Sequence, residues 1–546
     1  MLIFIWSLML PVLVLAYTEH NPFWVTLSGI LLPGGFYTIF ASLSERSGRM
    51  VWLGFVFIFF SAFQLVLSYL FGNSVVASDM FLNLLTTNAS EATELLGNIY
   101  PSVILVFVIY LPILWYATRH LRRRVIIPKE WRQRVFASGC VILLAGTLSL
   151  WIGCRGDVRQ TLRNEVFPVN VGYNLALSIS EALHISDFED SSQGFEYQAH
   201  RDSTAAEREI YVLVIGEASR ASSWQLYGYE RPTNPLLSSR EDICLFRGVT
   251  TQSNTTHKSV PMMLSSVHTS QHDELYRRKG LPALFNEAGF TTYFISNQKP
   301  QGAMIDKLAK DAHHIIYMDS PRYDMQMVET MRDIISTAPA HKMLFILHAY
   351  GSHFSYHQRY PRQFAMFQPD DDVAITRKNA HMIRNAYDNS ILYTDYFVNE
   401  IIGTLESYPD VCGAMFYCSD HGEDLFDDKG RFLHSSPMVT YNQLHVASLA
   451  WFSKRYAGLF GDKVEAAHRN ADAPATTHSV FHTMADIASI STPYLRRNVS
   501  LVSELFDYDI PRLYLNDHNE AVLLNAEIGV DANEMALFRR AGIMLQ

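Results

Sequence analysis

The chain has 546 residues, of which 49% are hydrophobic and 18% charged, and its formal net charge is −10. At roughly one domain per 150 residues this length predicts two to four domains, and the composition is apolar for a soluble protein and polar for a transporter. The negative charge, with no basic stripe interleaved with aromatic residues beyond residue 200, argues against nucleic acid as a partner.

Long apolar runs fill the first part of the chain, each near the ~20 residues that cross a bilayer as a helix. They cover approximately residues 2–17, 24–43, 51–71, 103–118 and 135–152. We therefore predict a transmembrane domain of five helices over residues 1–155. The first run is also compatible with a signal peptide, although it lacks a basic segment and a clear small-residue cleavage site.

The loops between these runs predict the orientation in the membrane. Arg46 and Arg49 lie between the second and third runs, and residues 119–134, between the fourth and fifth, are rich in arginine, which places both loops in the cytoplasm. The loop 72–100 contains no lysine or arginine, so we expect it on the other side. An odd number of spans then places everything after residue 155 outside the cytoplasm.

Two segments next to the membrane carry further expectations. Asn83, Thr87 and Glu91 recur at a spacing of four, which aligns them on one face of a helix in the outer loop. Such a polar stripe is either a solvated helix face or a contact for a lipid head group. Residues 156–205 lack strong strand patterns and predict a connector that lies along the membrane surface.

From residue 206 onward, buried-type strands alternate with amphipathic helices. The strand candidates are residues 210–215, 291–295, 343–347, 413–418 and 447–452, and the clearest helix candidates are 280–288 and 383–405. This order predicts an α/β domain over residues 206–546, with a mainly parallel sheet and helices on both sides. In such folds the chemistry collects beyond the carboxyl ends of the strands.

The five cysteines predict neither a disulfide framework nor a zinc site of the cysteine type. Cys412 and Cys418 lie in one predicted strand about 20 Å long, which is too far for a bridge that needs Cα atoms roughly 5.5 Å apart. The remaining cysteines are Cys140, Cys154 and Cys244.

Acidic and imidazole side chains follow three of the predicted strands. Strand 210–215 runs into Glu217, strand 343–347 into His348 and His353, and strand 413–418 into Asp420 and His421. Each of these residues alone is more often a satisfied polar cap, but three strands with the same pattern favour a metal site. Carboxylate and imidazole without cysteine suit zinc or manganese.

The stretch 255–261 predicts a nucleophile at the start of a helix. Two threonines precede Lys258 and Pro261, and a helix tolerates proline in its first turn. A helix that begins near Thr256 would direct free N–H groups and its positive dipole end toward a phosphate. Threonine pairs are also ordinary N-caps, but beside a metal ion Thr256 would be an activated hydroxyl nucleophile.

At these residues the sequence resembles the bacterial phosphoethanolamine transferases, inner-membrane enzymes of the alkaline phosphatase/sulfatase superfamily that modify lipid A and related envelope glycans. The resemblance covers nearly the whole chain and is specific in the order and spacing of its motifs. These motifs are Val214-Ile215-Gly216-Glu217-Ala218-Ser219-Arg220, Tyr227-Gly228-Tyr229, Ser259-Val260-Pro261, Gly351-Ser352-His353, Tyr387-Asp388-Asn389-Ser390, Ser419-Asp420-His421-Gly422-Glu423 and His434.

The resemblance implies a role for each matching residue. Catalytic zinc is expected on Glu217, Thr256, Asp420 and His421, with Thr256 as the residue that becomes phosphorylated. Phosphate and substrate contacts are expected from His353, His434, His348 and Asn297, and lipid contacts from Asn83, Thr87 and Glu91. His353 and His434 are also candidates for holding a second metal ion, and manganese is an alternative to zinc.

The sequence departs from the family pattern at three places. Gln301 stands where the family often has a lysine, with Lys299 nearby, which puts the donor-phosphate contact in doubt. The disulfide set of the better-known members cannot form here, and His445 is followed by Val446 where proline is common. None of these departures touches the expected metal ligands, although the choice of acceptor is open.

Together these observations predict a monomeric, multi-pass enzyme of the bacterial inner membrane with its catalytic domain in the periplasm. It is expected to transfer phosphoethanolamine from phosphatidylethanolamine to lipid A, the lipopolysaccharide core or a periplasmic glucan through a phosphothreonine intermediate. The alternatives are a phosphoglycerol transferase or lipid phosphodiesterase of the same superfamily, and an inactive membrane scaffold. A sulfatase activity is disfavoured because Thr256-His257-Lys258 does not fit its nucleophile motif.

Overall fold

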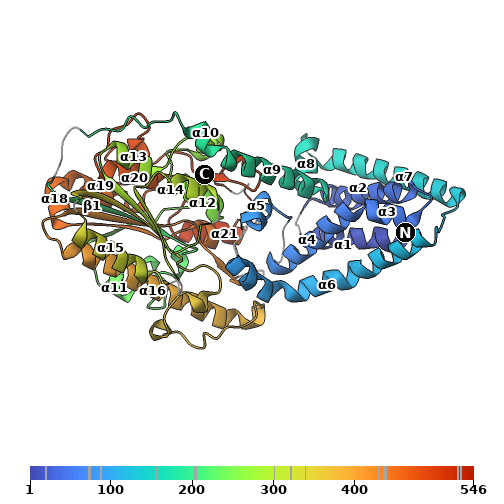
Figure 1. The fold of residues 1–546 in the computed structure, drawn as a ribbon, viewed down its shortest axis with the longest axis horizontal. Helices are drawn as coiled ribbons and strands as arrows, with labels where there is room; N and C mark the ends of the chain where they lie inside the picture. Colours follow the sequence, from blue (N-terminus) through green and yellow to red (C-terminus); the bar gives the residue numbers. More distant parts are fainter. Residues whose placement is uncertain are drawn as a thin grey trace. The chain divides into compact units, whose positions relative to one another are not determined.

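The chain folds into two compact units, Met1–Ser180 and Glu181–Gln546 (Figure 1). The structure, a computed structural model, describes residues 1–18, 21–71, 75–86, 89–154, 156–201, 206–300, 302–319, 323–338, 340–427, 431–434, 439–525, 528, 530 and 532–545. The boundary between the units falls within the predicted connector, inside helix α9.

The first unit is helical. Its helices are α1 (Leu2–Thr18), α2 (Phe23–Ser42), α3 (Ser47–Leu53), α4 (Phe55–Phe71), α5 (Ser78–Thr86), α6 (Ala89–Arg122), α7 (Lys129–Gly153), α8 (Val158–Glu165) and α9 (Val169–Ser186), the last of which continues into the second unit.

Helices α2 and α7 pack backbone to backbone because glycines line their contact. A Cβ on Gly35 would lie 2.6 Å from Leu143 N, and one on Gly139 would lie 2.7 Å from Ile39 Cγ1. Small residues that let two helices approach this closely are typical of packing between membrane helices.

Several of the apolar helices are long enough to cross a membrane, as the sequence predicts. Among the described residues three helices qualify by length and composition, Phe23–Ser42, Ile99–Arg122 and Lys129–Gly153. The third predicted run is not one straight helix, because α3 and the first part of α4 meet at a bend of 56°, and this pair would make a fourth span. Helix α1 is apolar but has 17 residues, so the count of five spans stays a prediction.

Close packing at Gly54 accompanies this bend. Gly54 separates α3 from α4, and a Cβ there would lie 2.7 Å from Phe4 Cζ and 3.1 Å from Phe40 Cε1. The run of apolar letters from 51 to 71 gives no sign of this contact, because it depends on the neighbouring helices.

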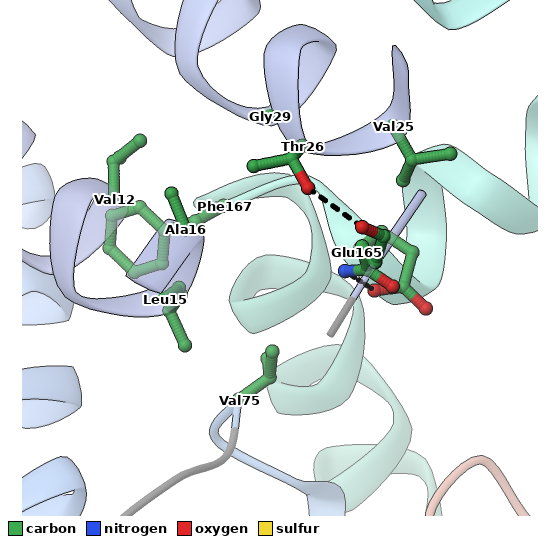
Figure 2. A pocket seen from close by; sticks show the side chains of 10 residues that line it. Val12, Leu15, Ala16, Val25, Thr26, Gly29, Val75, Glu165 and Phe167 are labelled. Carbon is green, nitrogen blue, oxygen red and sulfur yellow. Dashed lines mark hydrogen bonds between the residues drawn. The ribbon is translucent and has the colours of Figure 1, made fainter. Parts of the chain in front are cut away.

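A small cavity lies within the helical unit, between the ends of α1 and α2 and the segment after α8 (Figure 2). Its walls include Val12, Val25 and Phe167. Asn21 Nδ2 donates a hydrogen bond to Glu165 Oε2 at 2.7 Å at its polar side. This bond ties the start of α2 to the end of α8.

The predicted polar stripe of the outer loop cannot be compared with the structure. Thr87 lies outside the described residues, and the side chains of Asn83 and Glu91 lie outside the described part of α5 and α6. The expectation that these three residues contact a lipid head group therefore stays a prediction.

The second unit is built on a seven-stranded sheet in the order β2-β9-β6-β1-β5-β3-β4. Strands β6, β1, β5, β3 and β4 are parallel, whereas β9 runs antiparallel to both β6 and β2. The strands are β1 (Glu209–Gly216), β2 (Ile243–Leu245), β3 (Thr291–Ser296), β4 (His314–Tyr317), β5 (Lys342–His348), β6 (Cys412–Ser419) and β9 (Ser448–Phe452).

The predicted α/β class and mainly parallel sheet are confirmed, and all five strand candidates form strands. Every residue of β1 and β6 is buried, which explains their unbroken apolar runs. Strands β2 and β4 were not predicted, because β2 has three residues and β4 is a four-residue, partly exposed edge strand that contains His314.

Helices cover both faces of the sheet, as Figure 1 shows. On one face lie α11 (Pro235–Ser238), α15 (Met325–Thr337) and α16 (Ala380–Glu406). On the other lie α12 (Thr256–Met263), α13 (Leu281–Glu287), α14 (Met304–Ala309) and α20 (Ser479–Ile487). The predicted helices 280–288 and 383–405 correspond to α13 and α16.

Short elements complete the unit. The helices are α10 (Phe188–Ser192), α17 (Tyr441–Leu444), α18 (Lys454–Leu459), α19 (Gly461–Arg469) and α21 (Ala532–Arg540), and two antiparallel pairs are formed by β7 (Asp424–Leu425) with β8 (Phe432–Leu433) and by β10 (Leu513–Leu515) with β11 (Ala521–Leu523). All five cysteines are free, and Cys412 and Cys418 lie in one strand as predicted.

Candidate active site

The carboxyl ends of β1 and β6 bring Glu217 and Asp420 together. The two strands pair in parallel with Gly216 opposite Ser419, so the next residue of each strand leaves the sheet at the same level. Asp420 Oδ1 accepts hydrogen bonds from the N–H of His421 at 2.7 Å and from that of Ala218 at 3.2 Å. These bonds fix one oxygen of the Asp420 carboxylate and leave Oδ2 for another partner.

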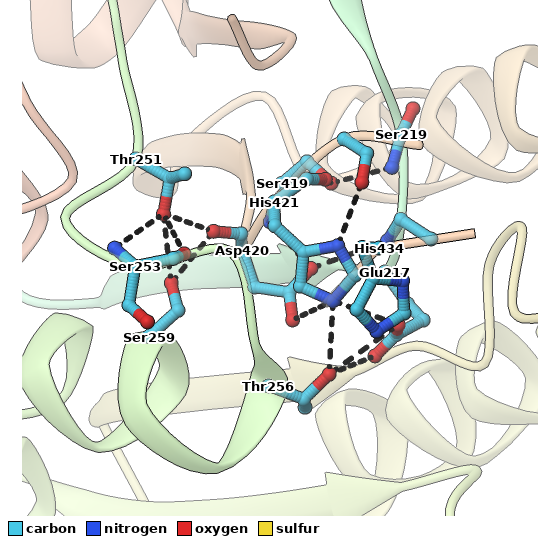
Figure 3. A network of polar contacts seen from close by, with 12 residues as sticks. Glu217, Ser219, Thr251, Ser253, Thr256, Ser259, Ser419, Asp420, His421 and His434 are labelled. Atoms are coloured by element: carbon cyan, nitrogen blue, oxygen red, sulfur yellow. Dashed lines mark hydrogen bonds and ion pairs between the residues drawn. The ribbon is translucent and has the colours of Figure 1, made fainter. Parts of the chain in front are cut away.

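Helix α12 brings Thr256 to these strand ends (Figure 3). Thr256 Oγ1 lies 3.1 Å from His421 Nε2, and 3.4 Å and 3.5 Å from the two carboxylate oxygens of Glu217. The helix begins at Thr256, as the sequence predicts. The hydroxyl and the acidic side chains therefore meet at the N-terminus of α12.

One turn further along α12, Ser259 ties the helix to the loop that carries Asp420. Ser259 Oγ donates to the backbone oxygen of Asp420 at 2.6 Å, and Thr251 Oγ1 donates to the same oxygen. Figure 3 shows these bonds on the side of Asp420 away from Thr256. The position of Thr256 relative to Asp420 is thus set through buried hydrogen bonds.

The side chains of Glu217, Asp420 and His421 have the composition and spacing of a metal site. One ligand atom from each lies within 4.8 Å of the others, and all three residues are buried. His421 Nδ1 lies 2.9 Å from the carbonyl oxygen of Gly422, so this nitrogen carries the proton and Nε2 presents its lone pair to the cluster. Asp420 Oδ2 is buried and accepts no hydrogen bond from the described residues.

The electrostatics of the cluster also fit a cation. Burial is the largest cause that raises the pKa of Glu217 well above its ordinary value, and the negative charge of Asp420 raises it further. Burial lowers the pKa of His421, which favours the neutral imidazole that a metal ion needs. Two carboxylates and one imidazole lone pair converge beside the Thr256 hydroxyl, so the residues present fit a divalent ion such as zinc.

His434 joins the cluster through the β7–β8 hairpin. Asp424 pairs with Leu433, which returns the chain toward His421 and places the two imidazole rings 3.8 Å apart. His434 Nδ1 lies 3.2 Å from Glu423 Oε1. Burial lowers the pKa of His434 to about 4 and raises that of Glu423 to about 8.

The charges of His434 and His421 influence His353, but His353 makes no side-chain hydrogen bond with Glu217, Asp420 or Thr256. Its ring stacks on Tyr350 at 5.0 Å, and its Nδ1 is buried without a hydrogen-bond partner among the described residues. Burial, and then the Arg359 guanidinium, lower its pKa well below the ordinary value. A buried neutral imidazole with an unused nitrogen can accept a hydrogen bond from a ligand or bind a cation.

His348 and Asn297 lie at neighbouring strand ends but bond to protein groups. His348 Nδ1 is 3.1 Å from Ser296 Oγ, and Asn297 Nδ2 donates to Asp324 Oδ1 at 2.8 Å. Asn297 Oδ1 is buried and accepts no hydrogen bond from the described residues. Lys299 is exposed, and Gln301 lies outside the described residues.

The neighbours of Thr256 differ partly from expectation. Thr255 occupies the N-cap position with extended backbone, but its side chain makes no capping hydrogen bond and its Oγ1 has no partner among the described residues. Thr255 is therefore the N-cap residue by position, without a side-chain capping bond. Lys258 Nζ donates to the backbone oxygen of Asn516, away from the Thr256 hydroxyl.

Two residues of the site escaped the sequence analysis. Gln298 Nε2 donates to Glu217 Oε2 at 3.0 Å, and Glu423 contacts His434. Gln298 follows β3 by two residues, so its place after a buried strand is the signal that points to it. Glu423 belongs to the motif Ser419-Asp420-His421-Gly422-Glu423, but its contact with His434 depends on the pairing of β7 with β8, which the motif does not specify.

Gly351 packs closely against the backbone of Glu217, and a substitution at Gly351 tests this contact. Gly351 has φ = +45°, and a Cβ there would lie 2.8 Å from Glu217 O and 3.0 Å from Glu217 N. We expect Gly351→Ala to destabilise the full-length protein by about 1–3 kcal/mol, because the backbone of Gly351 or Glu217 must shift to make room for the new methyl group. Thermal unfolding in detergent measures the effect. Gly403→Ala is the control, since Gly403 lies in α16 with nothing within 4 Å of a new Cβ; equal melting temperatures for the two variants would contradict the packing argument.

Comparisons with known proteins show which family this chain belongs to. The sulfatase family model matches residues 209–490, just over half of the chain. A Kdo(2)-lipid A phosphoethanolamine 7''-transferase of Salmonella typhimurium is 26% identical over 484 residues, which cover 81% of this chain and 83% of that protein.

Solved structures show the same fold. The lipooligosaccharide phosphoethanolamine transferase A of Neisseria meningitidis, an integral membrane protein, matches 92% of this chain and 98% of its own, with a TM-score of 0.69 and 21% identity. The C-terminal periplasmic domain of EptC from Escherichia coli, in complex with zinc, matches 60% of this chain and 94% of its own, with a TM-score of 0.53 and 24% identity.

Proposed function

The chain belongs to the sulfatase family, and we propose that it transfers phosphoethanolamine from phosphatidylethanolamine to lipid A or a related envelope glycan. The observation that carries the proposal is the position of Thr256 Oγ1, 3.1 Å from His421 Nε2 and 3.4 Å from Glu217 Oε2, at the start of α12. The similarity to a lipid A phosphoethanolamine transferase over four-fifths of the chain supports the choice of group and acceptor.

Zinc would be held by Glu217, Asp420 and His421, with the Thr256 hydroxyl beside them. When bound, zinc supplies a Lewis acid that lowers the pKa of a coordinated hydroxyl and offsets charge on a phosphoryl group. Manganese is the alternative ion, and His353 with His434 would provide for a second one.

In the first step Thr256 Oγ1 attacks the phosphorus of phosphatidylethanolamine. The bond from phosphorus to the diacylglycerol oxygen breaks, and the threonine proton ends on that oxygen, so diacylglycerol leaves as an alcohol. Thr256 then carries phosphoethanolamine as an ester. The N-terminal amides of α12 face the phosphate, because the first N–H groups of a helix have no acceptor within it.

In the second step a hydroxyl or phosphate oxygen of the acceptor attacks the same phosphorus and Thr256 leaves. The proton of the acceptor returns to Thr256, which restores the free hydroxyl. We assign the movement of these protons to His434, because its ring lies 3.8 Å from that of His421 and its Nδ1 contacts Glu423 Oε1. Inversion in each step requires the acceptor to approach from the face that diacylglycerol vacated.

The helical unit would place this chemistry at the membrane. We propose five spans over residues 1–155, a connector over 156–205 and a periplasmic catalytic domain over 206–546, with the arginine-rich loops in the cytoplasm. The three long apolar helices and the bent pair of α3 and α4 support this topology. Lipid donor and lipid A acceptor are then both available in the outer leaflet, and the protein is expected to act as a monomer.

Transfer from labelled lipid tests the proposal. The full-length protein, loaded with zinc, is incubated with phosphatidylethanolamine labelled in its ethanolamine and with lipid A, and the products are analysed by mass spectrometry. Labelled phosphoethanolamine on lipid A is the expected result. The same assay is repeated with labelled phosphatidylglycerol as donor and with core sugar or glucan as acceptor. Transfer of glycerol phosphate alone would favour the phosphoglycerol transferase, and no transfer from either lipid to any acceptor would favour an inactive scaffold.

A further inference from the structure

Gln298 lies at the carboxyl end of β3 and reaches Glu217 across the end of β5. The sheet order β1-β5-β3 places β5 between the strands that carry these two residues. Gln298 is 8% exposed, and its side chain points along the strand ends rather than toward solvent. It therefore belongs to the inner wall of the cluster that contains Glu217.

The amide of Gln298 uses one nitrogen for two acceptors. Nε2 donates to Glu217 Oε2 at 3.0 Å and to the backbone oxygen of Ala349 at 2.9 Å. A carboxylate and a carbonyl can only accept, so the two contacts fix which end of the amide is the nitrogen. Both hydrogens of this nitrogen are engaged, and the amide plane cannot turn without losing one of the bonds.

Ser296 and His348 hold Gln298 in turn. Ser296 Oγ donates to the backbone oxygen of Gln298 at 2.9 Å and accepts from its N–H at 3.1 Å. Since the single hydroxyl proton is used there, the 3.1 Å contact between Ser296 Oγ and His348 Nδ1 requires the imidazole to donate. His348 thus reaches the cluster through Ser296 and Gln298.

Glu217 needs such support because its carboxylate otherwise turns about a soft terminal torsion. Its Oε1 lies 3.5 Å from His421 Nε2, and its Oε2 lies 3.4 Å from Thr256 Oγ1. A hydrogen bond to Oε2 fixes the plane of the group and so sets where Oε1 points. An amide suits this place, because a lysine would neutralise the ligand and a second carboxylate would repel it.

We propose that Gln298 is a positioning residue that orients the Glu217 carboxylate for the metal ion and for Thr256, and that Ser296 and His348 hold Gln298 in that orientation. The inference rests on the metal site of the proposed function. It gives Gln298 a role that acts through Glu217 and not on the reacting atoms. It uses Nδ1 of His348, and the expected substrate contact of His348 stays a prediction, because Nε2 is buried without a hydrogen-bond partner among the described residues.

The test is the zinc affinity of the full-length protein, measured by competition with a chromogenic chelator. We expect Gln298→Leu to bind zinc about 10- to 100-fold more weakly, the usual effect of losing an outer hydrogen bond to a metal ligand. Ser296→Ala, a smaller change, is expected to weaken binding in the same direction. The visible spectrum of the Co²⁺-loaded protein should shift in both variants, because the coordination of Glu217 changes.

Gln252→Leu is the matched control. Gln252 is also buried and accepts a hydrogen bond from Thr269 Oγ1 at 2.8 Å, but it does not contact Glu217. We expect its zinc affinity and Co²⁺ spectrum to match those of the unchanged protein even if its melting temperature falls.

Unchanged zinc affinity and spectrum in Ser296→Ala and in folded Gln298→Leu would overturn the inference, as would an equal loss in Gln252→Leu. This outcome is distinct from failure of the proposed function. If the unchanged protein transfers phosphoethanolamine while these variants bind zinc normally, only the role of Gln298 is wrong. If zinc binding depends on Gln298 but no phosphoethanolamine is transferred, only the proposed reaction is wrong.

Discussion

Replacing Thr256 with alanine is expected to reduce phosphoethanolamine transfer by a factor on the order of 10⁴ to 10⁶, the scale seen when an enzyme loses its nucleophile. The hydroxyl of Thr256 lies within 3.5 Å of both Glu217 oxygens and 3.1 Å from His421 Nε2, and no other side chain of α12 is placed in this way among the described residues. The measurement is the rate at which labelled phosphoethanolamine appears on lipid A.

Thr255→Ala is the natural control for this experiment. Thr255 precedes Thr256 directly, is buried, and makes no side-chain hydrogen bond with the described residues. Its loss should leave the rate close to that of the unchanged protein. A rate for Thr256→Ala that equals that of Thr255→Ala would show that the Thr256 hydroxyl is not the nucleophile.

The second large effect is expected from Asp420→Asn. An amide in place of this carboxylate removes a negative charge from the cluster and turns a pure acceptor into a group that also donates. We expect the protein to lose zinc affinity by more than the ~10- to 100-fold typical of outer partners and to lose transfer with it. Metal content after dialysis, measured by atomic emission, reports the loss directly.

Asp388→Asn controls for the loss of a buried carboxylate. Asp388 is fully buried and accepts from Tyr229 and Arg231 at 2.9 Å and 2.8 Å, but it has no contact with Glu217 or His421. This variant should be less stable and should retain its zinc. Retention of zinc and transfer by Asp420→Asn would contradict the assignment of Asp420 as a ligand.

The residues that the sequence identified together are those whose position follows from the sheet alone. Parallel strands deliver their next residues to one edge, so Glu217, Asp420 and His421 converge once β1 and β6 are neighbours. Thr256 could be selected over Thr255 because the family resemblance aligns it through its spacing to Ser259-Val260-Pro261. Because the short helix α12 begins at Thr256, the Thr256 hydroxyl faces the cluster.

The supporting residues could not be predicted in the same way, because their roles depend on side-chain direction and strand order. His348 ends a strand next to β1, yet its imidazole bonds to Ser296 on β3. Strand β5 lies between β1 and β3, and Gln298 reaches Glu217 across the end of β5, so this contact depends on the strand order. Likewise the bend between α3 and α4 coincides with close contacts between Gly54 and neighbouring helices, which an apolar run does not specify.

If Thr256 carries the phosphoethanolamine between donor and acceptor, the ester on its hydroxyl can be trapped. The zinc-loaded full-length protein is incubated with phosphatidylethanolamine without acceptor, quenched, digested and analysed by tandem mass spectrometry. We expect phosphoethanolamine esterified to Thr256, and we expect this ester to disappear when lipid A is added before the quench. Thr256 would not be the carrier if the ester formed on another residue. It would also not be the carrier if lipid A were modified while Thr256 stayed unmodified and the Thr256→Ala variant stayed active.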